Sequence, residues 1–260
     1  MAKDRAADAD SVLRRLYEAG DEDARMAAAQ NEVEWRRTGE VPRRWLPDPP
    51  ARLLDVGGAS GRYTEWLIRL GYEVSIVDLV ARHVDQARAR GISAKIGDAR
   101  DLTHAADSVD VVLLMGPLYH LPSAADRARA LSEAVRVCRG GGQIIVAAMS
   151  RWAKPAVRAA RGGLHDVEIR RHLAAILRTG RDVAGSDFDR VSYNHDPGEL
   201  VTELETAGLR DVEILGVEGP LGAAARVDTR LNDYALRTAR IAESLAPHLS
   251  IHLLGRGRAD

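Results

Sequence analysis

Short apolar runs alternate with amphipathic stretches through the first 148 residues of the chain. Each run has the length of a strand, and the five runs cover residues 52–56, 73–77, 92–96, 109–114 and 143–148. Between the runs, apolar residues recur at helical spacing, as Tyr63, Trp66, Leu67 and Leu70 do. Strands that alternate with helices in this way predict a doubly wound parallel sheet. Such sheets bind ligands at the edge where the carboxyl ends of the strands meet.

The pattern changes after residue 148. A predicted helix at 166–178 interrupts the simple alternation, and Asp196-Pro197-Gly198-Glu199 predicts another helix start, with a cap, an early proline and an acid in the first turn. Residues 212–217 and 249–254 predict two further strands. Between these two strands, apolar residues recur at 4-3-4-3-4 spacing and predict one amphipathic helix whose apolar face is formed by Val227, Leu231, Tyr234, Thr238, Ile241 and Leu245.

These patterns divide the chain into four parts. Residues 1–50 form an N-terminal helical cap and linker, and residues 51–149 form the core of the sheet. Residues 150–195 form a helical insertion or lid, and residues 196–260 complete the core with an inserted helix at 226–246. The predicted fold is α/β, with a doubly wound, Rossmann-like sheet of seven strands that is mostly parallel with the last strand antiparallel. The N-terminal part either caps the ligand edge or packs against the sheet.

Composition narrows the classes of function. A length of 260 residues suits one domain with additions, and 45% apolar residues can supply its core. The net charge of −1 gives no bulk electrostatic argument for nucleic-acid binding. The single cysteine, Cys138, excludes an internal disulfide and a cysteine-built metal site, and we expect a packed thiol on a helix face and no metal. Neither a signal-peptide pattern nor a membrane-length apolar run is present, which predicts a cytoplasmic protein.

A glycine-rich stretch, residues 55–61 (DVGGASG), joins the first strand to the first helix. Glycines let a loop approach a ligand closely, and the free N–H groups of the following helix can meet an anionic group. The dinucleotide fingerprint Gly-x-Gly-x-x-Gly fails, because Ala59 and Arg62 stand at its second and third glycines. The pattern acid-x-Gly-x-Gly-x-Gly fits from Asp55 onward with Ala59 as its one departure, and alanine restricts φ there.

Two more acids follow predicted strands. Asp78 lies about 20 residues past the first loop glycine, where an acceptor-only side chain suits a ribose diol, although it can also cap the next helix. Asp98 follows the third strand, in a Gly97-Asp98-Ala99 segment that is also typical of a surface turn. The fourth strand ends at Met115, and the loop that follows it belongs to the same predicted edge.

From about residue 52 to residue 148 the chain resembles class I S-adenosylmethionine-dependent methyltransferases. The loop of residues 116–121 (GPLYHL) resembles the small-molecule "type 11" branch of that family. The resemblance implies that the 55–61 loop holds the methionine portion of S-adenosylmethionine, Asp78 the ribose and Asp98-Ala99 the adenine. The predicted cofactor-binding residues are Asp55, Gly57, Gly58, Ala59, Gly61, Asp78, Leu79, Asp98, Ala99, Met115 and Gly116.

The implied reaction is in-line transfer of a methyl group to an oxygen, nitrogen or carbon nucleophile of a small molecule, of the secondary-metabolite or aromatic kind. Positioning supplies most of the catalysis, and a base is needed only if the nucleophile must lose a proton. The catalytic candidates are His120, Tyr119 and His195, of which His120 is the best placed. The candidates for contact with the methyl acceptor are Tyr17, Trp152 and Tyr193. A structural role is the alternative for each of these six residues.

Two other functions remain open at this stage. RNA methylation is suggested by the arginines of residues 151–181, but Trp152 is the only aromatic residue among them, and the fourth-strand loop lacks the Asn/Asp-Pro-Pro-aromatic pattern. A non-catalytic S-adenosylmethionine-binding module is the other alternative, because Ala59 departs from the loop pattern. The sequence predicts no membrane partner and leaves a homodimer open.

Overall fold

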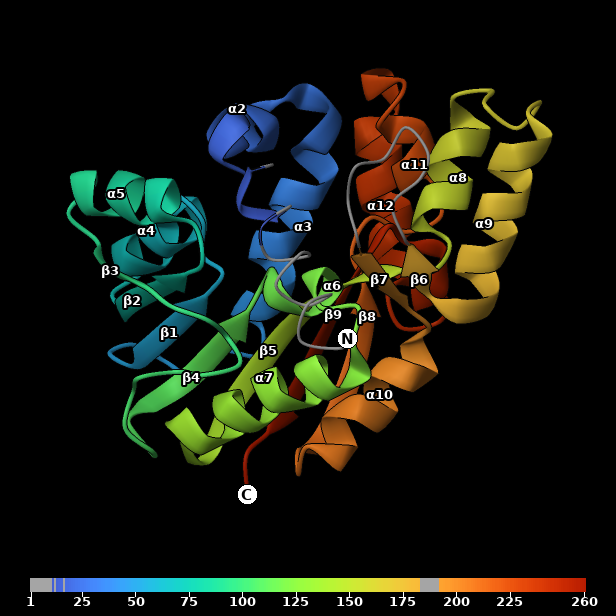
Figure 1. Cartoon of the computed structure of the whole chain (residues 1–260). Coiled ribbons are helices and arrows are strands. Elements are labelled where there is room, and N and C mark those ends of the chain that lie inside the picture. Colours follow the sequence, from blue (N-terminus) through green and yellow to red (C-terminus); the bar gives the residue numbers. More distant parts are fainter. Residues whose placement is uncertain (1–10, 12, 16, 183–191) are drawn as a thin grey trace.

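Figure 1 shows the computed structural model of the chain, which describes residues 11–182, apart from residues 12 and 16, and residues 192–260. The start of the predicted N-terminal cap and residues 183–191 of the predicted insertion fall outside the described residues. The strands are β1 (Arg52–Val56), β2 (Glu73–Asp78), β3 (Ser93–Ile96), β4 (Val109–Leu114), β5 (Cys138–Ser150), β6 (Arg181–Asp182), β7 (Ser192–His195), β8 (Arg210–Gly216) and β9 (His252–Arg258).

Helices precede, connect and follow these strands. They are α2 (Glu22–Ala27), α3 (Glu32–Arg43), α4 (Arg62–Arg69), α5 (Ala81–Ala89), α6 (Pro117–His120), α7 (Ala124–Val137), α8 (Ala153–Ala160), α9 (Val167–Thr179), α10 (Pro197–Thr206), α11 (Gly222–Ala225) and α12 (Asn232–Ala242). Short 3-10 turns cover Ala29–Asn31, Thr229–Leu231 and Pro247–Leu249. Among the described helices, none is both long and apolar enough to cross a membrane.

Seven strands form the main sheet in the order β3-β2-β1-β4-β5-β9-β8. The pairs from β3 to β5 are parallel, and β9 is antiparallel to both of its neighbours. The predicted mostly parallel sheet with an antiparallel last strand is therefore confirmed. The two short strands β6 and β7 were not predicted, and β7 joins the carboxyl end of β5 through Met149 and Ser150. The 150–195 segment thus returns to the ligand edge of the sheet.

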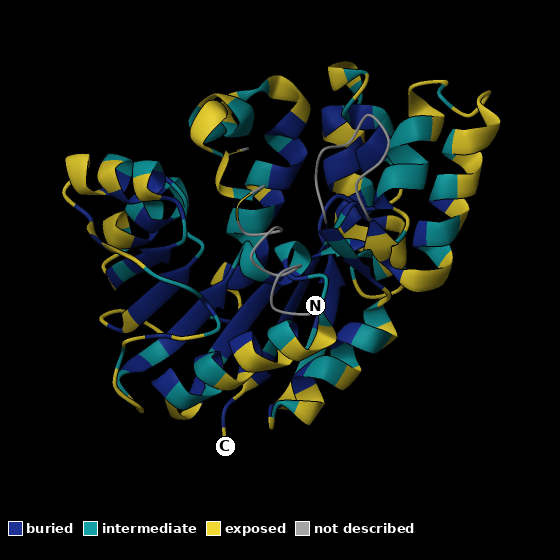
Figure 2. Ribbon diagram, viewed as in Figure 1, coloured by how far each residue is buried: buried dark blue, intermediate teal, exposed yellow. Residues whose placement is uncertain are grey.

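The continuous apolar runs are explained by burial on both faces of the sheet, which Figure 2 shows as a band of buried strands between helices. In β1, Leu53 packs on the face covered by α3 and α4, whereas Leu54 packs on the face covered by α7 and α10. The same alternation holds in β4, where Val111 and Val112 face opposite layers. The N-terminal helix α3 therefore packs against the sheet and does not only cap its edge.

The predicted helix at 226–246 differs most from the structure. The segment contains a 3-10 turn and the shorter helix α12, and the expected apolar face points outward, with Tyr234 64% and Ile241 72% exposed. The buried face carries small residues instead, because the chain at Gly219 approaches Ala239 so closely that a Cβ there would lie 2.7 Å from the Ala239 Cα. Cys138 is a buried thiol as expected, but it begins β5 and does not belong to α7.

Candidate functional site

Two cavities lie side by side at the carboxyl edge of the sheet. The larger has a volume of about 600 Å³ and the smaller a volume of about 120 Å³. Six residues line both cavities: Tyr17, Glu22, Gly57, Ala59, Tyr119 and His120. The glycine loop from the end of β1 and the loop from the end of β4 therefore form the boundary between the two spaces.

The glycine loop has the left-handed backbone that its sequence requires. Gly57 and Gly61 have φ values of 78° and 87°, a region that costs a residue with a Cβ on the order of 1–2 kcal/mol. Ala59, the departure from the pattern, takes the same region with a φ of 49°. Gly58 is required for a different reason, because a Cβ there would lie 2.7 Å from Asp55 Oδ2. The loop thus keeps the close approach that the sequence pattern predicted, with alanine accommodated at its centre.

Asp55 presents one free carboxylate oxygen to the larger cavity. Its side chain is 1% exposed, and Oδ2 accepts a hydrogen bond of 2.6 Å from the Thr64 hydroxyl. Oδ1 is buried and has no hydrogen-bond partner among the described residues. Burial raises the pKa of Asp55 to about 6, so the group is mostly ionised at neutral pH. An unpartnered buried carboxylate oxygen fits a cationic group such as the ammonium of a methionine portion.

The smaller cavity brings together the acids and backbone that we predicted for a ribose and an adenine. Asp78 is 6% exposed and accepts hydrogen bonds from the backbone N–H groups of Ala59 at 2.9 Å and Val80 at 2.8 Å. It therefore holds the glycine loop and the turn before α5 at the same time. Asp98 accepts from Arg100 Nε at 2.9 Å, so an adenine would share this carboxylate with an arginine. The predicted residues that line this cavity are Gly57, Ala59, Asp78, Leu79, Asp98, Ala99 and Gly116.

The two aromatic residues at the end of α6 lie at the boundary of the cavities. His120 Nε2 is 2.9 Å from the Tyr17 hydroxyl, and the two rings meet edge to face with centroids 5.6 Å apart. Burial raises the pKa of Tyr119 far above its ordinary value, so its phenol stays protonated and does not act as a base at neutral pH. Met115 lines the larger cavity beside them. The structure thus brings His120, Tyr119 and Tyr17 together at the boundary between the two cavities.

Three predicted residues are not brought to the site, because β7 and α8 direct them elsewhere. His195 is fully buried with Nε2 3.2 Å from Glu203 of α10, and the Tyr193 hydroxyl faces Glu199 of the same helix. Trp152 precedes α8 and is 47% exposed. None of the three lines either cavity. The structure thus gives no support to the catalytic role expected for His195 or to the acceptor contacts expected for Tyr193 and Trp152, and these roles stay predictions.

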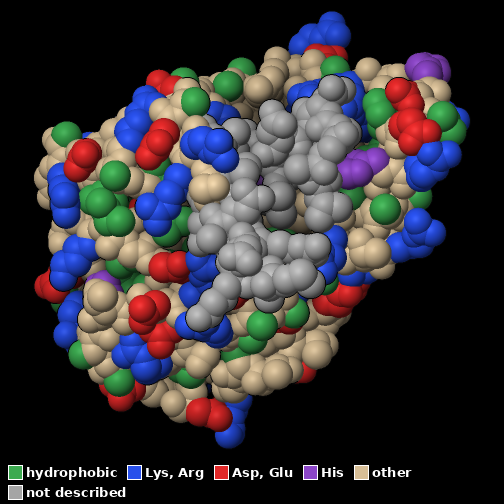
Figure 3. All heavy atoms as spheres, viewed as in Figure 1, with side chains coloured by type: hydrophobic (Ala, Val, Ile, Leu, Met, Phe, Trp, Pro, Cys, Tyr) green, Lys and Arg blue, Asp and Glu red, His purple; other side chains and the backbone are tan. Residues whose placement is uncertain are grey.

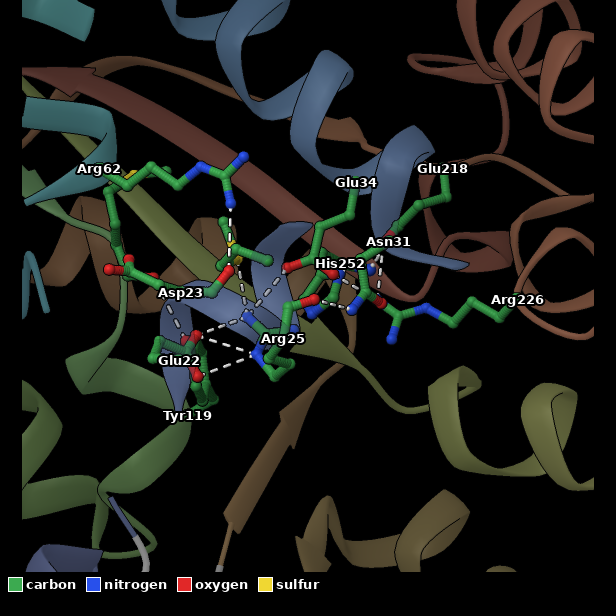
Figure 4. A network of polar contacts seen from close by, with 12 residues as sticks. Glu22, Asp23, Arg25, Asn31, Glu34, Arg62, Tyr119, Glu218, Arg226 and His252 are labelled. Carbon is green, nitrogen blue, oxygen red and sulfur yellow. Dashed lines mark hydrogen bonds and ion pairs between the residues drawn. The ribbon is translucent and has the colours of Figure 1, made fainter. Parts of the chain in front are cut away.

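A network of charged residues that lines the larger cavity was not predicted from the sequence (Figure 4). Arg25 pairs with Glu22 at 2.7 Å and lies 3.6 Å from Glu34, and Arg226 pairs with Glu34 at 2.6 Å. Burial disfavours the charged Arg25, but the hydrogen bond that it donates to Glu22 and the charge of Glu34 together raise its pKa. The walls beside this network are apolar, and they include Trp66, Leu113, Met149 and Ile251. The larger cavity thus combines an apolar body with one polar end.

The network continues into a carboxylate–imidazole pair formed by Glu218 and His252. Glu218 Oε1 is 2.5 Å from His252 Nδ1, and Oε2 accepts the His252 backbone N–H at 2.9 Å. Burial alone would raise the pKa of Glu218, but the charge of His252 lowers it to about 2. Glu218 follows the end of β8, so the strand-end rule that identified Asp55 and Asp78 could have found it.

Comparison with known proteins agrees with the resemblance to methyltransferases that the sequence indicated. Residues 54–146 match a family model described as a methyltransferase domain. An uncharacterized methyltransferase of Mycobacterium tuberculosis is 34% identical over 101 residues, which cover 38% of this chain and 40% of the relative. A ubiquinone/menaquinone biosynthesis C-methyltransferase of Roseobacter denitrificans is 30% identical over 162 residues, 58% of this chain and 60% of the relative. The chain thus spans less than two thirds of either relative.

A solved structure from Thermotoga maritima, described as a SAM-dependent methyltransferase and possible histamine N-methyltransferase, aligns with a TM-score of 0.63. The alignment covers 96% of this chain and 99% of that protein at 17% identity, a likeness of fold. Residues 54–146 therefore match a methyltransferase domain, and the chain has the fold of SAM-dependent methyltransferases.

Proposed function

We propose that this protein transfers the methyl group of S-adenosylmethionine to a small molecule that occupies the larger cavity. The observation that carries the proposal is the meeting of the two cavities at the glycine loop and at Tyr119–His120. The smaller cavity suits an adenosine, and the orphaned Oδ1 of Asp55 suits the ammonium of the methionine portion. When bound, this cofactor supplies a methyl group already activated by a sulfonium, so the protein's contribution is chiefly to bind and orient.

The larger cavity supports an acceptor with an apolar or aromatic body and a polar substituent. Its volume of about 600 Å³ is typical of small-molecule sites, although part of it would hold the methionine portion. Apolar side chains from α4, β4 and β5 form the body of the cavity, and Arg25, Glu34 and Arg226 form its polar end. Lys154 and Ser192 also line it, so we propose that the 150–195 segment contributes to a lid over the acceptor. The four-part division of the chain stays a prediction.

An RNA acceptor receives less support. Figure 3 shows Lys and Arg side chains mixed with Asp and Glu across the face in view. Within the arginine-rich segment, Arg151 pairs with Glu199, Lys154 pairs with Asp182, and Arg171 pairs with Glu168. These partners reduce the charge available to phosphates.

A non-catalytic cofactor-binding module would bind S-adenosylmethionine without turning over any acceptor. The homodimer and the cytoplasmic location stay predictions.

The proposal is tested by calorimetry and by a methyl-transfer assay. We expect the protein to bind S-adenosylhomocysteine and not NAD, and to methylate at least one member of a panel of phenols, amines and indoles. Binding of NAD without binding of S-adenosylhomocysteine would disprove the proposal. Binding of S-adenosylhomocysteine with turnover of RNA alone would favour the RNA alternative, and binding without any turnover would favour the non-catalytic module.

Asp78→Ala should weaken S-adenosylhomocysteine binding by roughly 1.5–3 kcal/mol, because it removes hydrogen bonds to a charged acceptor. It also removes the contact that holds the Ala59 N–H. Asp85→Ala is the matched control, since that acid lies on the following helix with a 74% exposed side chain. Titration calorimetry of both variants measures the effect, and equal affinities would show that Asp78 does not contact the cofactor.

His120→Ala should lower turnover by roughly 10- to 100-fold with little change in cofactor affinity, because misplacing an acceptor is costly in rate. We propose that His120 orients the acceptor, since its Nε2 already faces the Tyr17 hydroxyl at 2.9 Å. Tyr17→Phe removes only that hydroxyl and should reproduce part of the loss. Steady-state kinetics with the best acceptor of the panel test this prediction. Unchanged turnover in His120→Ala would show that His120 does not orient the acceptor.

A further inference from the structure

The Glu218–His252 pair has the geometry of a buried carboxylate that fixes an imidazole. Glu218 is 1% exposed and uses both oxygens on His252, one on the backbone N–H and one on Nδ1. Two contacts from one carboxylate hold both the start of β9 and the plane of the ring. With Nδ1 committed to Glu218, the proton-accepting position of the neutral ring is Nε2.

Within the Glu218–His252 pair, Nε2 of the His252 ring is the atom that can contact a bound molecule. His252 lines the larger cavity, and its side chain is 18% exposed whereas that of Glu218 is 2% exposed. Nε2 makes no hydrogen bond to any residue that the structure describes. His252 pairs with Met149 of β5, which is the neighbour of β4, so it lies on the acceptor side of the strand that ends at Leu114. His120, in contrast, lies at the boundary with the smaller cavity.

We propose that His252 is the general base of the methyl transfer and that Glu218 is its positioning residue. The proposal rests on the proposed function and specifies an acceptor whose reacting O–H or N–H must lose its proton. The lone pair of the acceptor atom forms the new bond to the methyl carbon, and the electrons of the broken carbon–sulfur bond remain on sulfur. The proton of the acceptor passes to Nε2, which becomes an imidazolium, and then leaves to solvent.

The charges around the ring set the pH range in which His252 can accept a proton. The charged groups facing His252 are Glu218 after β8, Glu34 of α3 and Arg226 after α11. Burial lowers the pKa of His252, but the charges of Glu218 and Glu34 together raise it above the ordinary imidazole value. Proton acceptance should therefore become effective as pH rises through this raised pKa.

The cluster of Glu34, Glu218 and His252 does not need a metal ion to balance its charge. Ligand-type atoms of Glu34, Glu218 and His252 lie within 4.8 Å of one another. Arg226, however, is 2.6 Å from Glu34 and 3.6 Å from Glu218, and Arg25 is 3.6 Å from Glu34, so two guanidinium groups already balance these two carboxylates. A neutralised cluster with one free imidazole nitrogen is better suited to accept a proton than to hold a cation.

The first test needs no acceptor. Histidine resonances are titrated by NMR, with His252 assigned from His252→Asn, whose side-chain amide can still donate to Glu218 but has no equivalent of Nε2. We expect a His252 pKa above 6.5, the ordinary imidazole value, that falls in Glu218→Gln because a negative charge is removed. Diethyl pyrocarbonate should label His252 in the wild-type protein. A pKa that does not respond to Glu218→Gln, or a His252 that is not labelled, would overturn the proposal.

The second test uses methyl transfer to catechol, with the phenols of the panel as further probes. His252→Asn should lower turnover on the order of 10²- to 10⁴-fold, with S-adenosylhomocysteine affinity retained and partial rescue by added imidazole. Glu218→Gln should move the rising limb of the pH–rate profile to lower pH, a change that a purely structural role would not produce. His248→Asn is the control, because His248 is exposed and lies four residues before His252.

The outcomes separate this proposal from the proposed function. Wild-type turnover of catechol in His252→Asn would overturn the role of His252 while methyl transfer itself stands. Failure of the wild-type protein to bind S-adenosylhomocysteine or to methylate any probe would instead remove the proposed function. The NMR titration and the diethyl pyrocarbonate labelling would still decide whether Nε2 of His252 can accept a proton while Glu218 holds Nδ1. Circular dichroism and thermal unfolding of each variant confirm that it is folded.

Discussion

Gly57→Ala should lower the affinity for S-adenosylhomocysteine by about 100-fold or more, the scale on which misplaced binding groups act. Gly57 has a φ of 78°, and a Cβ there would lie 2.8 Å from Pro117 Cδ. The contact links the loop after β1 to the loop after β4, and both loops line both cavities. A methyl group at this position would push the two loops apart at the boundary where the cofactor is expected.

Gly91→Ala is a matched control for this prediction. Gly91 has the same φ of 78°, but a Cβ there would meet no atom within 4 Å. Both variants should lose on the order of 1–2 kcal/mol of folding stability, because each puts a side chain into the left-handed region. Only Gly57→Ala should lose affinity as well. Calorimetric titration of the two proteins decides the matter, and an equal loss of affinity in both would show that backbone strain, not the Pro117 contact, is responsible.

The sheet and the cofactor edge could be predicted from the sequence because burial on two faces leaves a strong signal. The parallel strands β1, β2 and β4 are rich in buried apolar residues, and an acid stands at or near the carboxyl end of β1 and β2. Asp55 and Asp78 could therefore be placed at one edge without knowledge of their contacts. The sequence indicated that alanine restricts φ at position 59, and in the structure Ala59 has a positive φ of 49°.

The acceptor side could not be predicted in the same way. His252 lies at the start of β9, and because this strand is antiparallel, its beginning meets the carboxyl ends of the others. A rule that searches only the ends of strands misses it. Arg25 and Glu34 lie in helices before the sheet, and each residue is 18 or more positions ahead of β1, so only tertiary packing brings them to the cavity.

The exposed apolar face of α12 shows a limit of prediction from the spacing of apolar residues. The spacing of large apolar residues predicted the helix, but it did not predict which face is buried. Close approach of two backbones selects small residues, and Ala235 and Ala239 satisfy that requirement while Tyr234 and Ile241 remain outside. A pattern based on hydrophobicity alone gives such a helix the wrong orientation.

Arg37→Ala should destabilise the protein by roughly 3 kcal/mol, at the lower end of the range for breaking a buried ion pair. The Arg37 side chain is fully buried in α3, pairs with Glu40 at 3.0 Å and with Glu243, and donates to the Val217 carbonyl at 3.2 Å. Its loss leaves that carbonyl without this donor. Glu243 keeps Arg44 at 2.7 Å, which is why we do not expect the upper end of the range.

Arg36→Ala, one residue earlier on the same helix, is the control. Its side chain is 49% exposed and pairs only with Glu32, 3.3 Å away, so the change should stay within about 0.5 kcal/mol. Thermal unfolding should separate the two variants by roughly 6–12 °C for a protein of this size. Equal melting temperatures would mean that Arg44 alone neutralises Glu243. Because Val217 directly precedes Glu218 and α3 carries Glu34, a real loss at Arg37 should also loosen the wall that holds His252.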